Sequence, residues 1–250
     1  MPPSSAPSRP RTLASHVARL ASLGALSAEA KESPLPRLVL MSLFAVALLA
    51  ARVLRTHSGA YSFLAWNLFL AWIPFALGLA VERFVAGRAH AAVIAAASLA
   101  WLLFLPNAPY LVTDLIHLRF RHDAPIWFDS VMLMAFAWTG LTLGVGSVRR
   151  LAGVVGARWG VGRARAFVIA VALLSGYGIY LGRFVRLNSW DLAAHPGWVM
   201  SELLEPLAHP LAMAHAWSVT VTQAALFLMI YATMGAFGPA APRPLPDSSR

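Results

Sequence analysis

Long apolar runs recur along the chain, and they constrain its fold more than any other feature. Several contain about 17 or more residues, which is close to the length that an α-helix needs to cross the ~30 Å hydrocarbon core of a membrane. Of the 250 residues, 59% are hydrophobic and 12% are charged, which is more apolar surface than a soluble domain can hide. We therefore predict an all-α fold, a polytopic transmembrane helical bundle.

The order of these runs predicts the domain organisation. Residues 1–36 are rich in Pro, Ser, Ala and Arg, and we expect a disordered cytoplasmic tail there. Residues 37–235 form the predicted transmembrane domain, and residues 236–250 a second disordered tail. The predicted spans, about six in number, are 38–54, 61–81, 89–106, 130–148, 166–186 and 212–234.

The distribution of charge predicts the orientation of the spans. With both termini in the cytoplasm, fourteen of the 20 Lys and Arg residues fall on the inner side, as the positive-inside rule favours. The inner segments then carry all of the net charge of +10, so the basic composition indicates topology and nucleic acid is not an expected partner. The chain has no cysteine, which excludes disulfides, thiolate nucleophiles and Cys-ligated metals.

The third apolar run is interrupted by the sequence FLPNAPYLVTDLIHL. The apolar part before the interruption would cover about 24 Å as a helix, less than a full crossing. Pro106 removes a backbone donor and Pro109 disfavours helical backbone at Ala108, so we expect the third span to be broken from Pro106 to Pro109. Asn107 is expected to cap a second helix with its side chain. Broken helices in membranes occur mainly beside protein or water-filled cavities, so the break predicts a polar pocket.

Polar residues share one face of this second helix. Tyr110, Asp114, His117 and Arg121 follow one another at steps of four, three and four, which places them on one side of a helix. The predicted topology brings further polar residues to the same end of the bundle. These are Asp129 at the start of the fourth span, and Arg183, Arg186, Asn188 and Asp191 at the end of the fifth.

Several of these residues also have a structural interpretation. Asp129 precedes an apolar run, where a carboxylate suits a helix N-cap. Arg183 and Arg186 lie near a helix C-terminus, where cations are favoured without any function. Asn67 suits an interhelical hydrogen bond. Two GxxxG pairs, in the fourth and fifth spans, predict close helix packing; they are Gly140 with Gly144 and Gly178 with Gly182.

Asp114 and His117 carry the functional hypothesis. Pairing with Arg121 or Arg183 would neutralise Asp114, but a histidine on the same face then has no evident structural need. We predict Asp114 and His117 as the catalytic pair, with acid–base chemistry by a histidine that a carboxylate orients. The predicted substrate-binding residues are Asn107, Tyr110, Arg121, Arg183, Arg186, Asn188 and Asp191.

A metal site is an alternative, because carboxylate and imidazole groups are ligands that zinc and manganese accept. The metal candidates are Asp114, His117, Asp129 and Asp191. No HExxH motif accompanies them, and the sequence leaves the cofactor unknown. A small-solute transporter is a second alternative, since discontinuous helices form substrate sites in transporters. A non-catalytic envelope or membrane-complex assembly subunit is a third, so whether the chain is an enzyme stays open, as does its oligomeric state.

Three sequence blocks carry a resemblance to a known family. PNAPYLVTDLIH, FAWTGLTLG and GRFVRLNSWD resemble an uncharacterised bacterial integral-membrane family, domain of unknown function 1361, over about residues 40–235. The resemblance implies a polytopic membrane protein and brings no known activity. It also implies that the following residues form the signature of the family: Asn107, Tyr110, Asp114, His117, Arg183, Asn188 and Asp191.

These observations combine into one expectation. We expect a multi-pass protein of the bacterial cytoplasmic (inner) membrane, with both termini in the cytoplasm and a polar site at the extracytoplasmic face. The site is expected to bind an anionic lipid-linked or small substrate, for hydrolysis or group transfer. The expected partners are the lipid bilayer and an anionic lipid headgroup.

Overall fold

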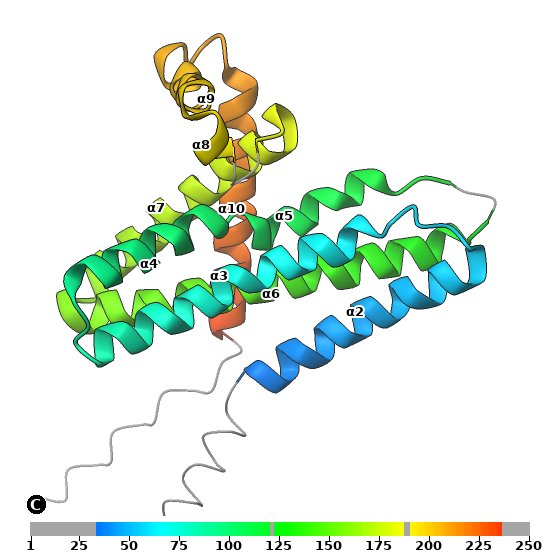
Figure 1. The fold of residues 1–250 in the computed structure, drawn as a ribbon, viewed down its shortest axis with the longest axis horizontal. Coiled ribbons are helices and arrows are strands. Elements are labelled where there is room, and N and C mark those ends of the chain that lie inside the picture. The colour runs from blue at the N-terminus through cyan, green and yellow to red at the C-terminus, as the bar shows by residue number, and fades with distance from the viewer. Residues whose placement is uncertain (1–33, 121–122, 188–190, 237–250) are drawn as a thin grey trace, which may run out of the picture. The chain divides into compact units, whose positions relative to one another are not determined.

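The computed structural model describes residues 34–120, 123–187 and 191–236 (Figure 1). The predicted tails therefore lie almost wholly outside the described residues, as do Arg121 and Asn188, and the predicted domain boundaries stay predictions. The chain divides into two compact units, Met1–Val39 and Leu40–Arg250, and every contact described below lies within the second. The regular elements of the described residues are all helical, which confirms the predicted fold class.

The helices follow the chain without a strand between them in the described ranges. Two short elements differ from an α-helix: η1 is a 3₁₀ helix and η2 is a π-helix. In order, the elements are α2 (Leu35–Thr56), α3 (Phe63–Ala86), α4 (Ala91–Phe104), α5 (Asn107–Thr113), η1 (Asp114–His117), α6 (Ile126–Trp159), α7 (Val161–Tyr180), η2 (Leu181–Val185), α8 (Asp191–Ala194), α9 (Pro196–Ala208) and α10 (Ala214–Ala236).

Six of the described stretches are long and apolar enough to cross a membrane, which confirms the prediction of about six spans. They are Leu35–Thr56, Phe63–Ala86, Ala91–His117, Ile126–Trp159, Val161–Val185 and Ala214–Met234. The third span differs from its expected range, because it continues through the break as far as His117. Asp114 and His117 therefore lie at the end of a span and not beyond it. The chain is a multi-pass membrane protein.

The break in the third span is shorter than expected. It comprises Leu105 and Pro106, whereas Ala108 and Pro109 lie inside α5, so the expected exclusion of Ala108 from a helix is wrong. Leu105 and Pro106 both keep helical backbone angles. Figure 1 accordingly shows α5 continuing in the general direction of α4 after an offset in the ribbon. Pro109 is tolerated because it falls in the first turn of α5, where a backbone N–H has no helical partner to lose.

Asn107 stabilises the break in a way that the sequence did not predict. The Ala108 N–H donates to the Leu105 carbonyl at 3.1 Å. In a regular helix it would instead donate to the Phe104 carbonyl, four residues back. The Asn107 side chain takes its place, because its Nδ2 donates to the Phe104 carbonyl at 2.9 Å. The expected cap, with Asn107 accepting from a backbone N–H, is therefore wrong: Asn107 is a donor and Pro106 occupies the N-cap position.

Helix α6 packs closely against the broken segment because it presents glycine there. A Cβ atom added at Gly140 would overlap the Ala108 carbonyl oxygen, and one added at Gly144 would lie 3.2 Å from the Ala108 Cβ. The two helices contact each other along this face. The predicted role of this GxxxG pair in close packing is confirmed.

Helix α7 and η2 approach the broken segment from another side, again through glycine. A Cβ atom added at Gly178 would overlap the Pro106 ring, and one added at Gly182 would lie 3.4 Å from the Tyr110 ring. The predicted packing role of this second pair is confirmed as well. Both GxxxG pairs thus hold the segment that contains the break, and so fix where Tyr110 and the residues after it lie.

We predict that Gly178→Ala destabilises the bundle while Gly153→Ala does not. The added methyl group at Gly178 must displace the Pro106 ring, and overpacking of this kind costs about 1–3 kcal/mol. Gly153 in α6 has no atom within 4 Å of an added Cβ, and alanine is favoured over glycine in helices. Thermal unfolding of the detergent-solubilised variants, followed by tryptophan fluorescence, measures the difference. Equal unfolding midpoints for the two variants would contradict this packing account.

Candidate functional site

Arg183 lies at the centre of a polar cluster between the third and fifth spans. Helix η2 carries it, and its Nη2 lies 2.5 Å from Asp114 Oδ1. Its Nε and Nη2 donate to Thr113 Oγ1 at 3.0 and 2.7 Å. The side chain of Asp114 is 1% exposed and that of Arg183 is 16% exposed, so this is a largely buried ion pair. The guanidinium is thus bound by two adjacent residues at the junction of α5 and η1.

Asn67 completes the surroundings of the buried carboxylate. Its Nδ2 donates to Asp114 Oδ2 at 2.8 Å, so both carboxylate oxygens have a donor. A buried charge is stable only when it is paired and hydrogen-bonded, and Asp114 meets both conditions. The interhelical role expected for Asn67 is confirmed, and it connects α3 with η1. Three spans therefore meet at Asp114.

His117 contacts the same arginine through its ring. Its Nε2 lies 3.2 Å from Arg183 Nη1. A guanidinium has donors and no acceptor, so this contact requires Nε2 to accept, which assigns the ring proton to Nδ1. The ring also stands edge-on to Phe63, with 5.0 Å between the ring centroids. The ring of Tyr110 lies against the guanidinium, 4.5 Å from its Cζ to the ring centroid.

A second ion pair joins the first and fourth spans. Arg52 Nε lies 2.7 Å from Asp129 Oδ1, and Arg52 Nη2 lies 3.3 Å from the other oxygen. The two side chains are 1% and 0% exposed. Asp123 approaches the same guanidinium at 3.7 Å. The expected N-cap role of Asp129 is wrong, because Pro125 precedes the first residue of α6 and Asp129 lies within the first turn.

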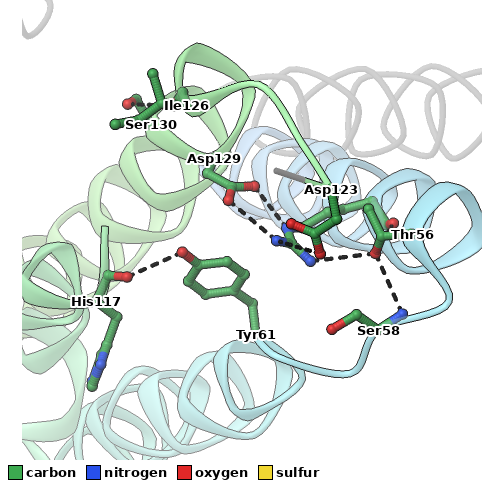
Figure 2. Close-up of polar contacts among 9 residues, drawn as sticks. Thr56, Ser58, Tyr61, His117, Asp123, Ile126, Asp129 and Ser130 are labelled. Atoms are coloured by element: carbon green, nitrogen blue, oxygen red, sulfur yellow. Dashed lines mark hydrogen bonds and ion pairs between the residues drawn. The ribbon is translucent and has the colours of Figure 1, made fainter. Parts of the chain in front are cut away.

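Tyr61 connects the two ion pairs. Its ring lies under the Arg52 guanidinium, 4.7 Å from Cζ to the ring centroid, and its hydroxyl donates to the His117 backbone carbonyl at 3.0 Å. Figure 2 shows Tyr61 between the His117 carbonyl on one side and Asp129, Asp123 and Thr56 on the other, with the imidazole pointing away from it. Tyr61 is 1% exposed, so both contacts are buried. The two clusters therefore lie at the same end of the spans.

The structure brings four of the predicted site residues together. We call the set Asn67, Tyr110, Thr113, Asp114, His117 and Arg183 the Arg183 cluster. Sequence reasoning missed Thr113, although its position before Asp114 and one turn before His117 places it on the same helical face. It also missed Arg52, whose signal was a charge inside an otherwise apolar span.

Of the remaining predicted site residues, Asn107 lines the cavity described below, and the others follow η2 in the chain or lie outside the described ranges. Arg186 follows η2 in a left-handed conformation with φ of 63°, and its side chain is exposed. Asp191 begins α8. Arg121 and Asn188 are not described. The substrate-binding roles assigned to these residues, and the catalytic roles assigned to Asp114 and His117, stay predictions.

The metal candidates do not form one cluster. Asp114 is paired with Arg183, and Asp129 is paired with Arg52. Within residues 34–120, 123–187 and 191–236, no group of three or more His, Asp or Glu side chains is placed to hold a metal ion. Two of the three candidate carboxylates, Asp114 and Asp129, therefore have an arginine as their cation.

A cavity of about 400 Å³ adjoins the Arg183 cluster. Helices α3, α4, α5, α7, η2 and α9 contribute its wall, and most of the lining side chains are apolar. Asn67 and Tyr110 belong both to the cluster and to the cavity wall, and Asn107 also lines the cavity. The Tyr177 hydroxyl, also at the wall, donates to the Leu203 carbonyl of α9 at 2.8 Å. The polar pocket expected at the helix break is thus a mostly apolar cavity with a few polar residues in its wall.

We predict that the Arg52–Asp129 pair can be replaced as a unit but not one residue at a time. Arg52→Met leaves a buried carboxylate without its arginine, which costs about 3–5 kcal/mol, whereas Arg52→Met with Asp129→Leu removes both charges. We expect the double variant to recover most of the thermal stability that the single variant loses. The exposed Arg55 on the same helix gives the matched control, Arg55→Met. Equal unfolding midpoints for the single and double variants would show that the pair does not act as a unit.

Comparison with known proteins places the chain in a family. No curated protein and no solved structure matches it. A family match covers residues 66–231, which is more than half of the chain and contains the whole Arg183 cluster. The match begins later than the residue 40 expected from the resemblance, so Arg52 and Tyr61 precede it. The chain belongs to the family described as "Protein of unknown function (DUF1361)".

Proposed function

We propose that this protein acts in the cytoplasmic membrane of a bacterium, with both termini in the cytoplasm, and binds an anionic lipid-linked or small molecule at its extracytoplasmic end. The observation that carries the proposal is the Arg183 cluster, in which one arginine contacts a carboxylate and a histidine beside a cavity. Ionisable residues within membrane spans are rare and commonly mark substrate sites.

Comparison of the two ion pairs supports a binding role for one of them. The side chains of Arg52 and Asp129 are 1% and 0% exposed, and each charge is neutralised by the other. Arg183 is 16% exposed and follows Gly182, which lines the cavity. An arginine fork binds carboxylate and phosphate groups through paired hydrogen bonds, so Arg183 has the chemistry to bind an anionic group. The first pair is proposed to be structural and the second to bind substrate.

The contacts of His117 suggest how chemistry would follow binding. In the structure its Nε2 is occupied by Arg183. An anionic group that drew the guanidinium toward the cavity would release Nε2, which would then accept a proton from an attacking water or hydroxyl group and return it to the leaving group as the bond to that group breaks. Asp114 would hold the displaced arginine close, since it is the ion-pair partner. Hydrolysis or group transfer is therefore the reaction class proposed.

We predict that the loop after η1 faces the outside of the cell. The chain has no cysteine, so single cysteines can be introduced without removing others. Arg119→Cys, in this loop, and Arg163→Cys, at the start of α7, both replace exposed side chains. In intact cells, a membrane-impermeant maleimide should label the first variant and reach the second only after permeabilisation. The reverse pattern would place the Arg183 cluster on the cytoplasmic side and overturn the proposed orientation.

We also predict that the protein retains an anionic amphiphile that depends on the Arg183 cluster. Mass spectrometry of extracts from the purified wild-type protein should show one class of anionic lipid or lipid-linked molecule enriched over the bulk membrane. In Asp114→Asn with Arg183→Gln, which removes both charges together, we expect retention to fall by about tenfold, the effect of losing 1.4 kcal/mol of binding free energy. Arg88→Gln, two residues after the far end of α3, is the control. Unchanged retention in a folded double variant would contradict a binding role for the cluster.

A broken span beside a cavity also fits a small-solute transporter. In that case, purified protein in proteoliposomes would move a solute across the bilayer, and Asp114→Asn would abolish the flux. Retention of an amphiphile without any flux would favour the binding or enzymatic function over transport.

A further inference from the structure

We propose that the cavity beside the Arg183 cluster holds a hydrocarbon chain, so that the ligand of the site is an amphiphile whose tail lies between the spans. The inference rests on the proposed function, because it assigns the polar end of the ligand to the cluster. It goes further by placing the hydrocarbon tail of the ligand in this cavity and by naming the route by which the ligand enters.

The character of the cavity wall fits a chain with one polar end. Asn67, Asn107 and Tyr110 line the cavity, and two of them contact the Arg183 cluster: Asn67 donates to Asp114, and the ring of Tyr110 lies against the Arg183 guanidinium. The rest of the wall is largely aliphatic and aromatic, with Leu70 and Leu102 among its residues. A small hydrophilic molecule would leave this apolar surface in contact with water. A hydrocarbon chain would bury the surface, which stabilises the complex by about 25 cal/mol per Å² of buried apolar area.

The sides of the spans provide an entrance. Trp66, Leu103 and Leu174 line the cavity, yet their side chains are 54%, 46% and 51% exposed. They come from three different spans, Phe63–Ala86, Ala91–His117 and Val161–Val185. Apolar side chains that are exposed on membrane spans face lipid, so the cavity opens toward the acyl chains of the bilayer. A lipid tail can enter through this opening without passing through water.

Helix α9 forms another part of the wall. Its Val199 and Leu203 line the cavity, and Val199 is 5% exposed. The helix is held in place by Tyr177, whose hydroxyl donates to the Leu203 carbonyl, and by Trp217, whose indole Nε1 donates to the Pro206 carbonyl at 3.1 Å. The tail is therefore enclosed by spans and α9, with the side opening as its entrance.

A photo-reactive lipid tests this proposal. The probe is phosphatidylglycerol with a diazirine near the end of one acyl chain, present at low density in phosphatidylethanolamine vesicles that contain the full-length protein. Cross-links should map to the cavity wall. Leu103→Trp fills the opening, and we expect it to lower the cross-linking yield by about tenfold, equivalent to 1.4 kcal/mol of binding free energy.

Leu99→Trp is the matched control, since Leu99 lies one turn away on α4, is exposed, and is not part of the cavity wall. It should cross-link as the wild type does. Leu174→Trp, also at the opening, should reproduce the effect of Leu103→Trp. Equal yields for the Leu99 and Leu103 variants, or cross-links spread evenly over the outer faces of the spans, would overturn the proposal.

A second experiment, with inorganic phosphate, distinguishes failure of the tail-binding proposal from failure of the proposed function. Inorganic phosphate is the probe for the polar end alone. Phosphate binding that is lost in Asp114→Asn with Arg183→Gln, combined with equal lipid yields for the two tryptophan variants, would refute the tail site and leave the anion site standing. Cavity cross-links that persist at wild-type yield in the charge-free double variant would establish the tail site and refute the role of the cluster in binding the polar end.

Discussion

The buried ion pair between Asp114 and Arg183 determines the arrangement of everything around it. A carboxylate at the end of a membrane span is stable only with a cation and further donors, and Arg183 and Asn67 supply these. Satisfying that requirement brings the third span to the second and to the fifth. It also places Thr113 and His117 against the guanidinium. The helix break serves the same geometry, because glycines of α6 and α7 hold the broken segment close.

The two arginine–aspartate ion pairs, Arg52–Asp129 and Arg183–Asp114, differ in exposure and in their contacts. Tyr61 touches Arg52 with its ring and the His117 carbonyl with its hydroxyl, so the closed pair supports the backbone at the end of η1. The Asp114–Arg183 pair lies near the cavity, because the ring of Tyr110, which lines the cavity, contacts the Arg183 guanidinium and Gly182 of the wall precedes Arg183. In the proposed function the Arg52 pair holds the backbone in position, and Arg183 is the charge that binds the ligand. The apolar cavity next to them explains why such a site would lie within the spans of a membrane protein.

The features that could be predicted from sequence are local ones. Apolar runs identify the spans, the prolines identify the break, and the helical spacing places Tyr110, Asp114 and His117 on one face. The 3₁₀ turn of η1 alters that spacing without separating the residues. Non-local features escaped prediction: the pairing of Arg52 with Asp129 depends on which spans are neighbours. Arg183 was one of two arginines proposed as the partner of Asp114, and the structure pairs it with Asp114 by placing the fifth span beside the third, whereas Arg121 lies outside the described residues.

The most direct test of the account is an experimental structure of the wild-type protein in nanodiscs of bacterial polar lipids. The account predicts elongated density inside the cavity, with its polar end at Asn67 and Tyr110 and its tail leaving beside Leu103. It also predicts that the guanidinium of Arg183 contacts that polar end while remaining near Asp114. A cavity closed by its own side chains, with lipid density confined to the outer faces of the spans, would contradict the central claim.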